Sequence, residues 1–537
     1  MTIRHGRRAD RLWLGGGAVA TLALGVATVA YLLARFPYDG LYGQDSYAYY
    51  YQAIAFRQEL LGEPATPGQL YTTTGLYHWP VGYHLLLLLG FLLGGVQPVG
   101  GRLLTLFATL GSPVILYAIS GRLMVGSPGG LRALAGLVAG TVLLLTGTYM
   151  RFGLSLMADV PALFAILLGT YCWLRACSAQ GNAPARVGWG WALGAGLALG
   201  AAVLMRYGSA VVVAPLLVYL ALSPAPGVHA RVRLLGWAAL GLALALVPQA
   251  AYLLTHEAGP GYGETLAGWN VGNLFRRTVA GPDGSATYDQ PMIVFYLLSP
   301  LGDQAAGFLS RGLLPALGLG IGALVTRRRW AGLGFLLSWW IIPALVFSGT
   351  VYQAHRFVLS YLPAAAVAIG IGAALAAEWL LAVATAPHAR RALARGLAGL
   401  LVLLGAALGG VQDARATSAW AATQAGFQAS EQQVVALAQQ AAGPPGGTPR
   451  AVAFGITAAL YHYTGWPVVD LFLQDEAALA RFYAAPGPRL LIVPEASLAT
   501  QWAGTPVAAR WAWLQAHYTL TRQGVASGYT VYTVAPR

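Results

Sequence analysis

The chain has 537 residues, of which 57% are hydrophobic and 9% are charged. A soluble globular protein carries about a quarter charged residues, so this composition excludes an ordinary soluble enzyme. Repeated apolar runs of about twenty residues predict transmembrane helices instead. The formal net charge is +14, and all 32 basic residues are arginines. Their distribution along the chain decides whether this charge indicates a nucleic-acid partner or a membrane orientation.

Eleven apolar runs are predicted to be membrane spans. The first follows four arginines and is longer than the apolar region of a signal peptide, so we interpret it as a retained span. Residues 81–96 are ambiguous, because as a helix they would measure about 24 Å, short of the roughly 30 Å hydrocarbon core. The predicted spans are residues 12–35, 101–121, 133–150, 159–175, 189–205, 207–223, 234–254, 306–326, 331–348, 358–380 and 396–412.

The distribution of the arginines indicates whether residues 81–96 cross the membrane. If they do not, sixteen of the 32 arginines fall on the side of the N-terminus, and ten acids from Asp39 to Asp303 fall on the other side. The positive-inside rule favours this topology, with a re-entrant or juxtamembrane helix at 81–96, a cytoplasmic N-terminus and an extracytoplasmic C-terminus. The sixteen are Arg4, Arg7, Arg8, Arg11, Arg122, Arg132, Arg175, Arg186, Arg231, Arg233, Arg327, Arg328, Arg329, Arg390, Arg391 and Arg395.

The composition changes after residue 412. A helix is predicted at 428–442, followed by the breaker GPPGGTP and by strand-like runs that alternate with helical stretches at 475–485 and 497–517. The chain closes with a predicted hairpin, YTLTRQGVASGYTVYTVA. This alternation predicts a small α/β domain with a mainly parallel sheet. We therefore expect a membrane domain at 1–412 and an extracytoplasmic α/β domain at 413–537.

Asp45 and Asp159 are acids at external membrane boundaries with apolar or aromatic neighbours. Burial there would raise the pKa of a carboxyl group and make it a better base near neutral pH. Glycosyl transfer needs such a base to activate a hydroxyl or amine acceptor. The alternative is structural, because an Asp at the start of a helix is a common cap, and Pro161 follows Asp159 near the first turn.

The same external face carries arginines, histidines and aromatic residues. Arginine at a membrane boundary binds phosphate in a bidentate manner, although each one could also reach toward the interface or pair with a loop acid. An aromatic belt or an interfacial helix would explain the others as well. The residues on this face that we single out are Arg102, Arg151, Arg206, Arg356, Tyr42, Tyr47, His78, Trp79, Tyr262, Glu264 and His355.

Other partners are not indicated. The His and Cys spacings match no zinc motif, so no metal ligands are assigned, and a divalent metal has no support from the sequence. Cys172 and Cys177 give no disulfide framework. No stretch interleaves arginine and aromatic residues in the manner of a nucleic-acid groove.

Several motifs occur here in an order that resembles a known family. QDSYAYYYQA carries Asp45, and YHWPVGYHLLLLLG has Pro80 followed by Val81. GGRLLTLFATLGSP begins a span with Arg102, and LMADVPALFAILLG opens another with Asp159. GLALGAAVLMRYGSA ends a Gly-rich span, and HRFVLSYLPAAAVAIG contains Arg356. Over residues 10–375 the chain resembles the polytopic GT-C glycosyltransferases, especially the group of protein O-mannosyltransferases, lipid A aminoarabinose transferases and RgtA/B/C/D-like bacterial enzymes.

The resemblance implies an integral plasma (inner) membrane glycosyltransferase of the cell envelope. Its donor would be a polyprenyl-phosphate-linked hexose or pentose, and its acceptor a glycan, lipid or protein on the extracytoplasmic face. Asp45 would be the base for inverting attack, Asp159 would shape the site, and Arg356, Arg102 and Arg206 would bind the donor phosphate. Many relatives have Asp-Glu at the first acid where this chain has Ser46 after Asp45, and a second Pro where it has Val81.

Two other classes stay open at this point. A transporter or lipid-linked sugar flippase would have buried charges near mid-membrane, broken helices and internal repeats. A non-enzymatic scaffold would display the C-terminal domain without bringing the two acids together. An enzyme instead predicts that Asp45, Asp159 and the arginines converge on one external cavity.

Overall fold

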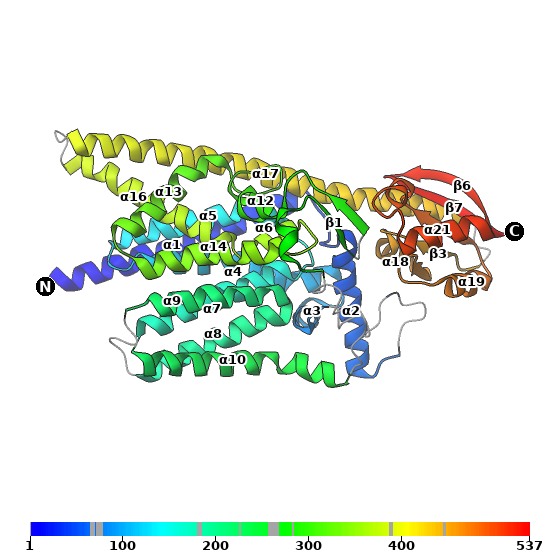
Figure 1. Cartoon of the computed structure of the whole chain (residues 1–537), viewed down its shortest axis with the longest axis horizontal. Coiled ribbons are helices and arrows are strands. Elements are labelled where there is room, and N and C mark those ends of the chain that lie inside the picture. Colours follow the sequence, from blue (N-terminus) through cyan, green and yellow to red (C-terminus); the bar gives the residue numbers. More distant parts are fainter. Residues whose placement is uncertain are drawn as a thin grey trace.

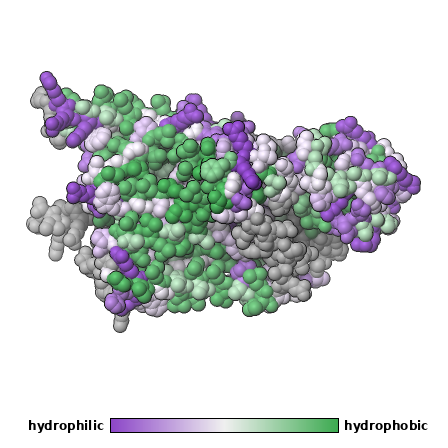
Figure 2. Space-filling view, viewed as in Figure 1, coloured by the Kyte–Doolittle hydropathy of each residue, from purple (hydrophilic) through white to green (hydrophobic). Residues whose placement is uncertain are grey.

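The computed structural model describes residues 2–64, 70, 79–179, 185–224, 227–255, 268–281, 284–385, 390–443 and 447–537. A bundle of long helices makes up most of the molecule, and a smaller α/β domain is attached to one end (Figure 1). The N-terminus lies at the opposite end of the bundle. Figure 2 shows a broad apolar surface over the bundle and a more polar surface on the C-terminal domain, as expected for a protein whose helices face lipid.

Eight helices in the described part of the chain are long and apolar enough to cross a membrane. Seven of them contain a predicted span in full, and α16 contains all of 358–380 except its first four residues, so the polytopic α-helical class is confirmed. They are α1 (Thr2–Arg35), α4 (Pro98–Leu123), α7 (Asp159–Ala179), α8 (Ala185–Met205), α10 (Val228–Thr255), α14 (Trp330–Ser348), α16 (Leu362–Thr385) and α17 (Arg390–Ala442).

The other three predicted spans are broken or short. The first consists of α5 (Gly129–Leu144) and α6 (Gly147–Gly153), which meet at a bend of 69°. The second joins η2 (Tyr207–Val212) to α9 (Val213–Leu222), and the third joins η5 (Arg311–Leu313) to α13 (Leu314–Thr326). The exact number of eleven membrane crossings therefore stays a prediction.

The turns with arginines gather at the N-terminal end of the bundle. Arg327 donates from Nη1 to Ser127 Oγ at 3.2 Å, and Arg329 donates from Nη2 to the Val125 carbonyl oxygen at 2.6 Å. These bonds join the α13–α14 turn to the α4–α5 turn. Helix α16 ends and helix α17 begins at the same end, away from the C-terminal domain (Figure 1). Arg327 and Arg329 thus lie at the end of the bundle opposite the C-terminal domain.

Two shorter helices, α2 (Gly43–Leu61) and α3 (Val81–Gly94), lie at the other end. Figure 1 shows α2 crossing the end of the bundle beside the C-terminal domain. The 14 residues of α3 span about 21 Å, too short to cross the hydrocarbon core. The second long loop, between α10 and α13, adds η3 (Val271–Phe275), the hairpin β1 (Thr278–Gly281) and β2 (Gly284–Thr287), α12 (Met292–Leu297) and η4 (Ser299–Leu301). The sequence did not predict this hairpin.

Helix α17 connects the bundle to the C-terminal domain without a break. It has 53 residues, which corresponds to about 80 Å, far more than the membrane thickness. Both the predicted last span, 396–412, and the predicted helix 428–442 belong to it. The predicted domain boundary between residues 412 and 413 therefore falls inside one continuous helix, and no linker separates the two parts.

The C-terminal domain has a five-stranded mixed sheet with strand order β4-β3-β5-β7-β6. The β3–β4 and β3–β5 pairs are parallel, whereas β5–β7 and β6–β7 are antiparallel. The expectation of a mainly parallel sheet was thus half wrong, because the terminal hairpin adds its strands antiparallel. The elements are β3 (Arg450–Ala453), α18 (Thr457–Thr464), β4 (Val468–Asp470), α19 (Glu476–Ala484), β5 (Arg489–Val493), α20 (Glu495–Ala499), α21 (Pro506–His517), β6 (Tyr518–Ala526) and β7 (Tyr529–Pro536).

The two faces of this sheet bury different layers. Leu490 and Ile492 of β5 belong to the same buried cluster as Val434 of α17, whereas Leu491 and Val493 belong to a second cluster with helices α19 and α21. This alternation follows from the two-residue period of a strand. One face of the domain is therefore packed continuously with α17, which fixes the domain on the end of the bundle.

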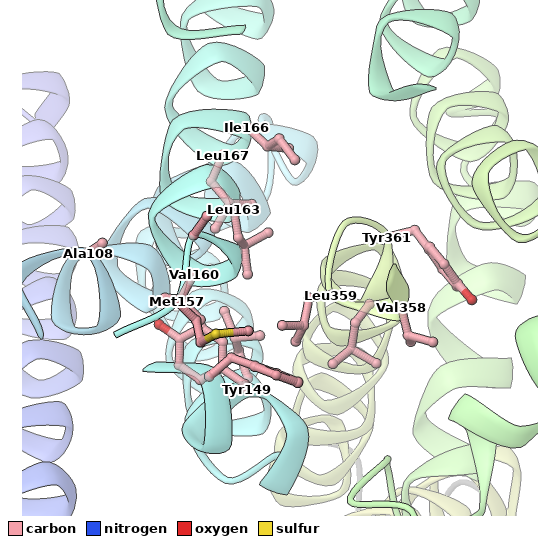
Figure 3. Close-up of a cluster of buried hydrophobic side chains, with 14 of the residues drawn as sticks. Ala108, Tyr149, Met157, Val160, Leu163, Ile166, Leu167, Val358, Leu359 and Tyr361 are labelled. Atoms are coloured by element: carbon pink, nitrogen blue, oxygen red, sulfur yellow. The ribbon is translucent and has the colours of Figure 1, made fainter. Parts of the chain in front are cut away.

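A buried apolar cluster holds the segments that carry the predicted site. Met157 and Val160, at the start of α7, lie opposite Val358 and Leu359, and all four side chains are buried (Figure 3). Val358 ends α15 (His355–Val358), the short helix before α16. This packing joins the segments that carry Asp159 and Arg356.

Candidate active site

Asp45 lies in the first turn of α2, and its carboxylate pairs with Arg356 of α15. The start of the helix is secured by Ser46 instead, whose hydroxyl accepts from the Tyr42 backbone N–H at 2.6 Å and donates to the Tyr42 carbonyl at 2.7 Å. Tyr42 is the N-cap and makes no side-chain cap bond. The alternative that Asp45 serves as a cap is therefore wrong, and its carboxylate faces an arginine 311 residues away.

Asp159 is the first residue of α7 and forms an ion pair with Arg206, which precedes η2. The Asp159 side chain is 2% exposed and the Arg206 side chain 21%. The Phe357 ring joins this pair to the first one, because the guanidinium carbon of Arg206 lies 5.4 Å and that of Arg356 lies 5.9 Å from its centroid. The two predicted acids and two of the predicted arginines thus form one connected group.

Arg151 is the third arginine at this site, and its surroundings are aromatic. Its guanidinium carbon lies 4.8 Å from the ring centroid of Trp420 and 5.2 Å from that of Tyr42, and it donates to the Tyr42 hydroxyl. Its buried Nε has no hydrogen-bond partner, and no acid forms an ion pair with it within the described residues. Among the described residues, no acid therefore balances its positive charge by an ion pair.

A cavity of about 250 Å³ lies beside Asp45, Arg356 and Arg151. It lies where the start of α2, the end of α6 and the start of α15 meet, at the end of the bundle that carries the C-terminal domain. The side chains around it combine one carboxylate, two guanidinium groups, an imidazole and aromatic rings. The lining residues are Tyr42, Gly43, Gln44, Asp45, Arg151, Phe152, Met157, Ala354, His355 and Arg356.

His355 reaches the cavity from a ring-lined environment. Its ring centroid lies 5.4 Å from that of Phe295 and 5.4 Å from that of Phe308. Burial, together with the charge of Arg151, lowers the pKa of His355 to about 4. The imidazole is therefore neutral near physiological pH and serves as a polar wall of the cavity.

This pKa has a testable consequence. Because a lowered pKa leaves the imidazole uncharged above about pH 5, His355 does not titrate in the range where an ordinary histidine does. We expect the pH–activity profile of His355→Asn to keep the wild-type shape between about pH 5.5 and 8, whatever its absolute rate. A change of activity with pH that the wild type shows in this range and the variant lacks would contradict the lowered pKa of His355.

Five of the predicted site residues that the structure describes do not line the cavity, namely Asp159, Arg206, Tyr47, Trp79 and Arg102. Tyr47 is two positions from Asp45, which is about 200° around a helix, and its hydroxyl donates to Glu431 Oε2 at 2.8 Å. Trp79 packs edge-on against Tyr49, with centroids 4.2 Å apart. Arg102 donates from Nη1 to the Tyr38 carbonyl at 2.8 Å. The lining roles predicted for Tyr47 and Trp79 therefore do not match their positions. His78, Tyr262 and Glu264 lie outside the described residues.

Several residues of the site were not predicted. Gln44 and Phe152 line the cavity, Phe357 joins the two ion pairs, and Trp420 covers Arg151 from α17. Gln44 and Phe152 could have been found, because each is adjacent in sequence to a predicted residue. Trp420 gave no signal, since it lies on the helix that was assigned to the C-terminal domain. Within the described part of the chain, no three His, Cys, Asp or Glu side chains gather closely enough to hold a metal ion.

Comparisons with known proteins identify the fold. Residues 44–259 match the family model of the dolichyl-phosphate-mannose-protein mannosyltransferases. The fold is similar to that of ArnT from Cupriavidus metallidurans in the apo state, with a TM-score of 0.61 and 17% identity over 97% of this chain and 98% of that chain. It is similar to the undecaprenyl-phosphate-bound ArnT as well, with a TM-score of 0.60 and 15% identity over 96% and 98% of the two chains.

A third similar structure is the oligosaccharyltransferase AglB from Archaeoglobus fulgidus in complex with an inhibitory peptide and a dolichol-phosphate. Its TM-score is 0.54, with 13% identity over 97% of this chain and 74% of that chain. No curated protein matches the sequence. The chain therefore has the GT-C fold of the polytopic membrane glycosyltransferases, and its residues 44–259 match the protein-mannosyltransferase domain.

Proposed function

We propose that the chain transfers a hexosyl or pentosyl group from a polyprenyl-phosphate donor to a hydroxyl or amine acceptor, with inversion, at the cavity beside Asp45. One observation carries the proposal. Asp45 meets Arg356 and Arg151 in a single cavity at the end of a membrane bundle. The mannosyltransferase match and the likeness to ArnT bound to undecaprenyl phosphate support a lipid-phosphate donor.

In the proposed reaction Asp45 is the general base. Its carboxylate takes the proton of the acceptor hydroxyl or amine while the acceptor atom attacks the anomeric carbon of the sugar. The bond between that carbon and the phosphate oxygen breaks, and the polyprenyl phosphate leaves with the bonding electron pair. General bases contribute about 10²- to 10⁴-fold to such steps. Attack opposite the leaving group inverts the anomeric configuration.

The arginines would hold the donor phosphate. Arg356 is paired with Asp45, so a bound phosphate would share this guanidinium and free the carboxylate for the acceptor proton. Arg151 adds a charge that no acid balances within the described residues, and a fork of guanidinium N–H donors suits a phosphate. Arg206 is held by Asp159 and would contribute through Phe357 and Arg356. Arg102 stays a further candidate for phosphate contact, with Nε and Nη2 unpaired beside Tyr38.

The proposed orientation in the membrane rests on charge. The arginine-bearing turns lie with the N-terminus, and the cavity lies with the C-terminal domain at the other end (Figure 1). With arginines on the cytoplasmic side of the plasma membrane, the cavity and residues 413–537 would face the extracytoplasmic space. A glycan, lipid or protein acceptor would then approach from that side.

A transporter is the alternative from another class. It would place its binding site near the bilayer midplane, between repeats that rock around it. The cavity here lies at one end of the bundle beside a polar domain, where a lipid-borne donor and a water-soluble acceptor meet. This position favours the glycosyltransferase.

The donor assignment can be tested with Arg151→Gln in purified protein supplied with a polyprenyl-phosphate sugar. We expect the donor KM to rise by about tenfold or more, because a charge-assisted contact to phosphate contributes roughly 1.5–3 kcal/mol. The acceptor KM should change less. The measurement is initial-rate release of polyprenyl phosphate as a function of donor concentration.

Arg481→Gln is a matched control, because Arg481 lies in the last turn of α19 in the C-terminal domain. An unchanged donor KM in Arg151→Gln, or an equal rise in Arg481→Gln, would remove Arg151 from the donor site. If the wild-type protein releases no polyprenyl phosphate from any such donor, the proposed function itself is wrong.

A further inference from the structure

Helix α2 presents two different faces, and each is occupied. Asp45, Tyr49 and Gln52 are spaced four and three residues apart and share one face, whereas Gln44, Tyr47 and Tyr51 share another. The first face meets the membrane bundle and the second meets the C-terminal domain. The catalytic helix thus lies between the two parts of the chain (Figure 1).

The face toward the bundle sets Asp45 against Arg356. Tyr49 packs edge-on against Trp79 and Tyr83, with centroids 4.2 and 4.9 Å apart. The Oε1 atom of Gln52 lies 3.2 Å from Nε2 of the buried His84 in α3. These contacts leave only Asp45 on this face beside the cavity.

The opposite face is held by three side-chain hydrogen bonds to the C-terminal part of the chain. Gln44 donates from Nε2 to Asp470 Oδ2 at 3.3 Å, and Tyr47 donates to Glu431 Oε2 at 2.8 Å. The Tyr51 hydroxyl lies 2.7 Å from His462 Nδ1. Partners on α17, α18 and β4 therefore hold successive turns of α2.

Aromatic packing reinforces these bonds. The ring centroid of His462 lies 5.5 Å from that of Tyr47 and 6.0 Å from that of Tyr51, and the Tyr461 centroid lies 5.0 Å from that of Tyr51. The tyrosine-rich sequence of α2 is thereby explained on this side by domain contact rather than by a substrate.

The partner residues are themselves fixed. Asp470 is 4% exposed and accepts from Thr457 Oγ1 at 3.0 Å and from the Phe472 backbone N–H at 2.9 Å. Glu431 accepts from the Tyr47 hydroxyl at 2.8 Å, and Tyr47 follows Asp45 by two positions in α2. A rigid partner is what a positioning contact requires.

We propose that the C-terminal domain positions the catalytic helix: Glu431, His462 and Asp470 hold α2 so that Asp45 lies at the cavity in the orientation for proton transfer. These are positioning residues, and none of them lines the cavity. The inference rests on the proposed function of Asp45. It gives the C-terminal domain a role in the rate of the reaction, separate from any role in acceptor recognition.

The test uses the full-length protein with the double substitution Tyr47→Phe and Tyr51→Phe, which removes two hydroxyls and keeps both rings. We expect kcat to fall by about 10- to 100-fold, while the donor KM stays within about twofold, because a small misplacement of a catalytic group costs this much without weakening donor contacts. Tyr532→Phe is the matched control, since its hydroxyl donates to Glu495 within the C-terminal domain. It should leave kcat unchanged.

A rescue experiment distinguishes positioning from a general loss of structure. Glu431→Gln keeps an oxygen that accepts from Tyr47 and should retain most of kcat, whereas Glu431→Leu should lose it. If the wild type transfers sugar and the double Tyr→Phe variant matches its kcat, the positioning inference is wrong. The positioning inference is also wrong if kcat falls as much in Tyr532→Phe or in Glu431→Gln as in the double variant. If the wild type transfers no sugar, the proposed function fails instead.

Discussion

Substituting Asp45→Asn should lower kcat for sugar transfer by about 10²- to 10⁴-fold, the contribution of a positioned general base. Asparagine keeps the shape of the side chain and lies in the same first turn of α2, but its amide cannot take the acceptor proton. Donor binding should persist, because both Arg151 and Arg356 remain at the cavity. In the variant, Arg356 has no ion pair with residue 45 to break before it binds the donor phosphate. The measurement is kcat at saturating donor and acceptor, together with the donor KM.

Asp39→Asn provides the control for this substitution. Asp39 precedes α2 by only a few residues, and its Oδ1 accepts from the Leu41 backbone N–H at 2.9 Å. It does not line the cavity, so transfer should stay within a few fold of the wild type. A kcat for Asp45→Asn that also stays within a few fold, at matched expression and thermal stability, would exclude Asp45 as the base.

The second large effect is expected on stability, at Asp159. Removing one partner of a buried ion pair leaves the other charge uncompensated, at a cost of about 3–5 kcal/mol. Asp159→Ala would leave the largely buried Arg206 in this condition beside Phe357. We expect a large decrease in the thermal unfolding temperature of the detergent-purified protein.

The double variant Asp159→Leu with Arg206→Met separates stability from function. Replacing a whole buried pair by apolar residues is often neutral or stabilising, so the unfolding temperature should return toward that of the wild type. Transfer should stay impaired, because the charge of Arg206 near Arg356 is lost. An unfolding temperature that does not change in Asp159→Ala would mean that the pair contributes little, and full activity of the double variant would remove Arg206 from the site.

The membrane part could be predicted from the sequence because lipid imposes long apolar runs and because arginines mark one side. The same reasoning predicted that 81–96 is a short helix at the membrane surface, and α3 has this length. The bend between α5 and α6 could not be predicted, because it depends on tertiary packing that hydropathy does not encode.

The continuity of α17 was missed for a physical reason. The composition becomes polar after residue 412, which favoured a boundary there. Residues 413–442 are nevertheless rich in Ala and Gln, and they contain a single glycine, Gly426, and no proline. Such a sequence continues a helix regardless of its solvent. A change to polar composition indicates where the chain leaves the membrane, whereas glycine and proline indicate where a helix ends.

The site was predicted in part. The acids and arginines could be identified because each is a charge at a span end, and four of them now form two ion pairs joined at Phe357. Which arginine pairs with which acid could not be derived, since Asp45 and Arg356 are 311 positions apart. Tyr47 was predicted to contact the substrate because its neighbours in sequence are aromatic. The rotation of α2 about its axis, which the structure shows, directs Tyr47 toward Glu431 instead.

The anomeric configuration of the product is the most direct test of inverting transfer from a lipid-phosphate donor. Purified wild-type protein would be supplied with a panel of polyprenyl-phosphate sugars of known configuration and with extracytoplasmic acceptors, and the product would be analysed by NMR. The expected result is a product with the opposite anomeric configuration to its donor, accompanied by an equal amount of polyprenyl phosphate. Retention of configuration, or transfer from a nucleotide sugar with none from any lipid-phosphate donor, would contradict the account.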